Sequence, residues 1–104
     1  MEIAVRGHHL DLTPSLHIYV EEKIGSLTRF SKDITLIEVE LTYDVSGRED
    51  NAFCADARIH RTGPDIRAEE RASEMHAAID LLHDKLKVQL LRHKGREQDK
   101  RRAT

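Results

Sequence analysis

The segment from Ile37 to Tyr43 places the strongest constraint on the fold. Its odd-numbered positions are apolar or aromatic, and its even-numbered positions are Glu38, Glu40 and Thr42. Alternation with a period of two is typical of a β-strand with one buried and one exposed face. Because such a strand needs other elements to cover its apolar face, the chain is predicted to fold around a sheet with one solvent-facing side.

The rest of the chain supplies further strands and two covering helices. Alternation predicts strands over residues 2–6, 53–60 and 66–69, with turns between them at 46–51 and 62–65. Thr13-Pro14 is typical of a helix start, and apolar residues at helical spacing follow to about Arg29. A second amphipathic helix is predicted from Ser73 to about Gly95. The order β-α-β-β-β-α favours an α+β fold with both helices on one face of a mainly antiparallel four-stranded sheet.

Length and composition indicate a single domain. A chain of 104 residues with 38% hydrophobic residues can bury one core but not two. We expect one domain over residues 1–95 and a flexible basic tail over residues 96–104. The lone Cys54 excludes an internal disulfide bond and favours a reducing compartment. Since no apolar run approaches the roughly 20 residues of a membrane span, a cytoplasmic protein is expected.

The net charge of −2 conceals an uneven distribution. From Lys85 to the C-terminus there are eight Lys and Arg against two Asp and Glu, which gives +6, and residues 1–84 carry −8. A basic end on an acidic body is suited to docking on phosphate. The same composition is also found in a solvated helix end whose cations complement the helix dipole. Charge alone therefore leaves both interpretations open.

The second predicted helix carries its cations on both sides of its apolar stripe. On a helical projection, Lys85, Arg92 and Arg96 fall on one side of the stripe, and Lys87 and Lys94 fall on the other. If the first helix packs beside the second, its Lys23 and Arg29 extend this basic strip across the helical layer.

Catalytic signatures are absent from the sequence. The five glycines are scattered, and no phosphate-binding loop, nucleophile elbow or HExxH motif occurs. A weak candidate metal cluster is formed by residues at helical spacing, namely His76, Asp80, His83 and Asp84. Cys54 is a weak candidate nucleophile, because no histidine partner is evident. The sequence therefore predicts a protein that is not an enzyme and has no cofactor or metal.

The predicted outer face of the sheet carries polar side chains in place of aromatic ones. It displays Glu38, Glu40, Thr42, Asp56, Arg58 and His60. Proteins that recognise single-stranded RNA on a sheet stack its bases on aromatic side chains of such a face. Because this face has none, the sequence favours folded RNA as the ligand, recognised through the helices by its shape and its phosphates. The alternative is a protein-interaction module that meets a basic partner with an acidic sheet face formed by Glu38, Glu40 and Asp44.

Short segments along nearly the whole chain carry a family resemblance. In order, these are IAVRG (3–7), LT (12–13), YVEEKI (19–24), LTRF (27–30), VEL (39–41), EMHAAID (74–80), DKL (84–86) and QL (89–90). Together they resemble the ribosome hibernation-promoting factor and ribosome-associated translation inhibitor family, whose fold resembles a double-stranded RNA-binding domain with an added first strand. The chain resembles the short type of this family, or a truncated form of the long type, which carries a second domain.

The resemblance implies a non-enzymatic factor that is made under stress or in stationary phase. Such a factor binds the small ribosomal subunit in the mRNA and tRNA channel near the decoding region, and it blocks translation by competing with mRNA and tRNA. In the family, basic residues of the helical layer face the rRNA. They correspond here to Lys23, Arg29, Lys85, Lys87, Arg92, His93, Lys94 and Arg96.

Overall fold

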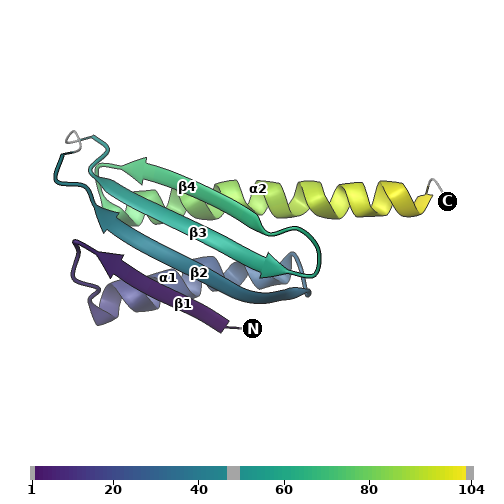
Figure 1. Ribbon diagram of the computed structural model, residues 1–104, viewed down its shortest axis with the longest axis horizontal. Coiled ribbons are helices and arrows are strands. Elements are labelled where there is room, and N and C mark those ends of the chain that lie inside the picture. Colours follow the sequence, from purple (N-terminus) through teal and green to yellow (C-terminus); the bar gives the residue numbers. More distant parts are fainter. Residues whose placement is uncertain (1, 47–49, 103–104) are drawn as a thin grey trace.

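The protein folds into a four-stranded sheet with two helices packed on one face. This computed structural model describes the backbone of residues 2–46 and 50–102, and the side chains of these ranges up to residue 93. The elements are β1 (Glu2–His8), α1 (Pro14–Gly25), the 3-10 helix η1 (Ser26–Arg29), β2 (Ile34–Tyr43), β3 (Phe53–Arg61), β4 (Ile66–Ala72) and α2 (Met75–Arg102). Both helices lie behind the sheet in Figure 1, which confirms the predicted α+β fold.

The sheet has the order β1-β2-β3-β4. β1 runs parallel to β2, and the other two pairings are antiparallel. The register places apolar residues opposite one another on the helix-facing side, as in the pairs Val5↔Val39 and Val39↔Ala57. Cross-strand pairs of this kind fix the register, because a slip by one residue would turn every apolar side chain towards water.

The core lies between the sheet and the two helices. From the helices, the side chains with no exposed surface are Val20, Ile24, Leu27, Ala78, Ile79, Leu82 and Leu86. They meet Ile37, Leu41 and Ile59 of the sheet, which are also fully buried. Alanines occupy the inward positions 55, 57 and 68 of β3 and β4, on which α2 packs. Small side chains here allow the long helix to approach the sheet closely.

The first helix begins as the sequence predicts. Thr13 is the N-cap, with its Oγ1 accepting a hydrogen bond from the backbone N–H of Leu16 at 3.2 Å, and Pro14 is the first helical residue. The helical path continues to Arg29 as predicted, but its last turn is the 3-10 helix η1. Tight 3-10 turns are common at helix ends.

The strands and the second helix are longer than the sequence suggested. β1 ends at His8 rather than residue 6, β2 begins at Ile34 rather than Ile37, and β3 ends at Arg61 rather than residue 60. β4 extends to Ala72 rather than residue 69, because Arg71 and Ala72 still pair with β3 and Ala72 continues the row of buried side chains. The expected end of the second helix near Gly95 is wrong, since α2 continues to Arg102 and projects beyond the sheet (Figure 1). A single glycine costs a helix only about 1 kcal/mol, and good helix formers surround it. The flexibility expected of residues 96–104 stays a prediction.

Within the part of the chain that the structure describes, no helix combines the length and the apolarity that crossing a membrane requires.

Candidate nucleic-acid interface

A groove lies where α1 and η1 meet α2. Its floor is the apolar seam between the helices, where Val20 and Ile24 of α1 pack in the same core as Leu82 and Leu86 of α2. Residues next to this seam on each helix reach the rim, because helical neighbours three and four positions apart share a face. Tyr19, Lys23 and Ser26 on one wall, and His83 and Lys87 on the other, follow this spacing.

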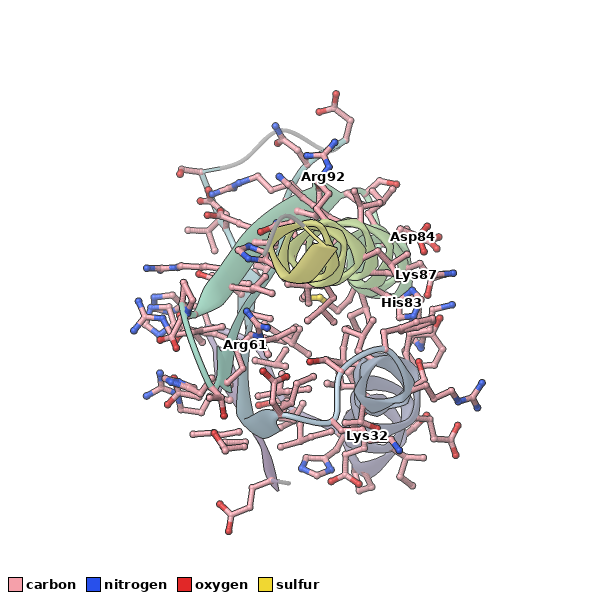
Figure 2. The ribbon with its side chains drawn as sticks, turned by 90° about the vertical axis from the view of Figure 1, so that its right-hand side faces the viewer. Lys32, Arg61, His83, Asp84, Lys87 and Arg92 are labelled. Carbon is pink, nitrogen blue, oxygen red and sulfur yellow. The ribbon has the colours of Figure 1, made fainter. Side chains whose placement is uncertain are left out.

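The groove has a volume of about 440 Å³ and carries an excess of positive charge. Its α1 and η1 wall consists of Tyr19, Glu22, Lys23, Ser26 and Arg29, followed by Phe30, and its α2 wall consists of His83 and Lys87. Three of these residues are cations and one is a carboxylate. Figure 2 shows His83 and Lys87 on the same side of α2, away from the sheet. The groove therefore opens on the outer surface of the helical layer.

The lining side chains hold one another in place. The Lys87 ammonium lies over the Phe30 ring, with Nζ 5.1 Å from the ring centre, which is a cation–π arrangement. Lys23 Nζ lies 3.7 Å from Oδ1 of Asp80. Ser26 donates its hydroxyl proton to the carbonyl oxygen of Lys23 at 2.7 Å, and its Oγ lies 3.4 Å from Nε2 of His83. The two walls are thus joined by polar contacts across the groove.

Tyr19 and Asp80 form a further contact between α1 and α2 at one end of the groove. Tyr19 donates its hydroxyl proton to Asp80 Oδ1. This hydrogen bond is the main reason that the pKa of Tyr19 is raised to about 12, and burial adds to the effect. The His76 ring packs edge-on against Tyr19, with the ring centres 4.6 Å apart.

The candidate metal cluster is not assembled. Asp80 contacts Tyr19 and Lys23, whereas the His83 ring faces Ser26 on one side and Asp84, at 3.0 Å, on the other. Among the residues that the structure describes, no three His, Cys, Asp or Glu side chains are grouped so that they could hold a metal ion.

A second group of predicted site residues lies on the opposite side of α2. Lys85, Arg92 and His93 line a shallow hollow of about 470 Å³ together with Val88 and Gln89. Lys85 is also held by its ion pair with Glu70 of β4. Figure 2 shows Arg92 on a different side of α2 from Lys87. These residues therefore face the β4 side of the molecule.

The predicted site residues thus form two groups rather than one continuous strip. Lys23, Arg29 and Lys87 come together at the groove, as expected if the first helix packs beside the second. Lys85 and Arg92 lie on the other side of the apolar stripe, as the helical projection predicts. The side chains of Lys94 and Arg96 lie outside the described residues. The RNA-binding role of all eight residues stays a prediction.

Sequence reasoning missed five residues that complete the groove. Together with the predicted cations, the groove is lined by Tyr19, Glu22, Ser26, Phe30 and His83. The available signal was their spacing, because Tyr19, Lys23, Ser26 and Phe30 succeed one another at intervals of three or four.

The outer face of the sheet is balanced in charge rather than acidic. Glu40 pairs with Arg6 at 3.3 Å, and Asp44 pairs with Arg71 at 3.1 Å. Glu38 lies 2.9 Å from the His60 ring, and this hydrogen bond lowers the pKa of Glu38. Because each carboxylate of the proposed acidic face already has a partner, the structure gives no support to docking of a basic protein there.

Two known structures are similar to this chain in architecture. A ribosomal subunit interface protein from Coxiella burnetii matches with a TM-score of 0.79 and 25% identity, covering 91% of this chain and 99% of that one. The N-terminal domain of Protein Y from Thermus thermophilus matches with a TM-score of 0.78 and 28% identity, covering 89% of this chain and 99% of that one. The protein therefore falls in a class of small α+β domains that includes a ribosomal subunit interface protein.

The sequence comparisons define the family. A family model described as Sigma 54 modulation protein / S30EA ribosomal protein matches residues 3–98, so the chain belongs to this family. A ribosome hibernation promoting factor from Azotobacter vinelandii is 38% identical over 97 residues, which make up 93% of this chain and 86% of that protein. These matches confirm the resemblance identified from the sequence.

Proposed function

We propose that this protein is a ribosome hibernation factor that binds the small ribosomal subunit. It occupies the mRNA and tRNA channel near the decoding region and inhibits translation by occupancy, without catalysis, under stress or in stationary phase. Its place of action is the cytoplasm, where the ribosomes are. The family membership and the 38% identical relative, which is named as a ribosome hibernation promoting factor, support the ribosome as the partner.

The observation that carries the proposal is the groove between α1 and α2. It presents Lys23, Arg29 and Lys87 on the outer surface of the helical layer. Cations on a rigid scaffold bind the phosphates of folded RNA without reading its sequence. The outer sheet face offers no comparable excess of positive charge, because the hollow on it is lined by three arginines and by three carboxylates, those of Glu38, Glu40 and Asp56. In the proposed complex, the helical layer is therefore the side of the protein that faces rRNA.

The experiment that tests the proposal is competition for the channel. Binding of the labelled protein is measured on empty small subunits and on subunits loaded with mRNA and initiator tRNA. Occupancy of a shared channel predicts clearly weaker binding to loaded subunits and a matching inhibition of translation in a reconstituted system. Equal affinity for empty and loaded subunits would contradict the proposed location. No binding to either would contradict the ribosomal function itself.

A further inference from the structure

The groove between α1 and α2 contains more than docking on phosphate requires. Besides its cations, it includes the half-buried ring of Phe30 at the end of η1. The Lys87 ammonium lies 5.1 Å from the centre of this ring. The Lys87 ammonium covers this face in the structure, and its flexible stem allows it to move to a phosphate and leave the face to a flat ligand. Phosphate binding needs only charge, so an aromatic face beside cations indicates a ligand that is both flat and anionic.

Size and polar groups narrow the class of ligand. The groove, at about 440 Å³, is within the range of about 300–1,000 Å³ that is usual for small-molecule sites. Polar atoms are also available, because the Ser26 hydroxyl donates to the Lys23 carbonyl and, besides its 3.4 Å contact with His83 Nε2, keeps a lone pair for another donor. Glu22 adds a carboxylate acceptor on the same wall. Acceptors next to a ring face suit the amino and hydroxyl donors of a nucleoside.

We propose that the groove receives one unpaired nucleotide of RNA. Its base stacks on Phe30, and its flanking phosphates lie near Lys87 and Arg29. A base inside a duplex is stacked on both faces, so it cannot enter the groove unless it leaves the helix. This inference rests on the proposed function and adds to it, since the protein then requires an extruded base as well as a phosphate surface.

Two RNA hairpins of equal length test this inference. One contains a single-nucleotide bulge, and the other is fully paired. Binding of each to the full chain is measured by fluorescence anisotropy at one salt concentration. Stacking of one base on an aromatic ring predicts at least about a five-fold tighter complex with the bulged hairpin. Equal affinity for the two hairpins would overturn the inference.

Variants of Phe30 test whether the preference for the bulged hairpin depends on the groove. Phe30→Leu keeps an apolar side chain against the core but removes the ring, and it is expected to abolish the preference. Phe30→Tyr keeps the ring and the preference, which guards against a folding defect in the leucine variant. Tyr43→Leu is the matched control, because Tyr43 is an exposed ring on β2 that packs on Phe53. A preference that survives Phe30→Leu, or one that Tyr43→Leu removes, would contradict the assignment.

Binding of the same variants to small ribosomal subunits separates this inference from the proposed function. If the wild type binds subunits but does not distinguish the hairpins, the ribosomal function stands and the nucleotide site is wrong. If it prefers the bulged hairpin but does not bind subunits, the nucleotide site stands and the ribosomal function is wrong. Loss of subunit binding in Phe30→Leu, with rescue in Phe30→Tyr, supports both.

Discussion

At the residue scale, Cys54 shows how the structure settles a question of reactivity. The sequence places it on a strand without an evident catalytic partner. In the structure its side chain is buried, and its Sγ–H donates to Glu69 Oε1 at 3.1 Å. Burial, followed by this hydrogen bond, raises the pKa of Cys54 to about 12. The thiolate is the nucleophilic form, so the folded protein holds this cysteine in its inert form.

We predict that Cys54 reacts with iodoacetamide at pH 8 at least about a hundred-fold more slowly in the folded protein than in the urea-unfolded chain. The rate is followed by mass spectrometry of the alkylated protein. Glu69→Gln is expected to remain slow, because burial is the larger cause of the raised pKa. Comparable rates for the folded and unfolded chains would show that the thiol is neither buried nor protonated as described.

Local residue patterns predicted the structural features that depend on a single helix or strand. The Thr13 cap and the alternation in β2 are properties of adjacent residues, and the structure confirms both. The groove could not be foreseen in the same way. Its contact between Ser26 and His83 joins residues 57 positions apart, and it depends on how two helices pack against each other. Helical spacing predicts which residues share a face but not which faces meet.

At the element scale, α2 has two faces with opposite roles. Leu82, Leu86 and Leu90 point into the core, whereas Leu81, Val88 and Leu91 are exposed by roughly half. The helical projection placed Lys85 and Lys87 on different sides of the buried stripe, and the structure agrees. The length of α2 was underestimated because Gly95 was interpreted as a stop signal. Glycine ends a helix when it takes a left-handed cap conformation, whereas at Gly95 the helix continues.

Substitution of two leucines of α2 tests which face of this helix is turned towards the core. Leu86 is fully buried and Leu91 is 44% exposed. We predict that Leu86→Ala lowers the free energy of unfolding by about 2–5 kcal/mol, because it leaves a cavity between helix and sheet. Leu91→Ala, the matched control on the same helix, is expected to change it by no more than about 0.5 kcal/mol. Urea unfolding measures both values. A similar loss in the two variants would show that the assigned rotation of α2 is wrong.

At the scale of the whole molecule, the outer face of the sheet and the helical layer differ in their balance of charge. On the outer face of the sheet, arginines and carboxylates line one hollow in equal number, whereas the helical layer exposes Arg29 and Lys87 at the groove and Arg92 on the far side of α2. A net charge of −2 is therefore compatible with RNA binding, because the phosphate-facing surface is only part of the molecule. From the sequence, the basic C-terminal segment predicts cations on the second helix, and Lys23 and Arg29 are expected to extend them if the two helices pack side by side. The structure brings Lys23 and Arg29 together with Lys87 at the groove.

The salt dependence of binding to small ribosomal subunits tests the central claim most directly. The logarithm of affinity is expected to fall linearly with the logarithm of salt concentration. The groove variant Arg29→Gln/Lys87→Gln is predicted to bind more weakly and to have a slope that is shallower by about 2, because each lost phosphate contact reduces it by about 1. The outer-face variant Arg58→Gln/Arg67→Gln, which removes equal charge, is predicted to keep the wild-type slope. An unchanged slope in the groove variant, or an equal reduction in both, would contradict docking through the groove.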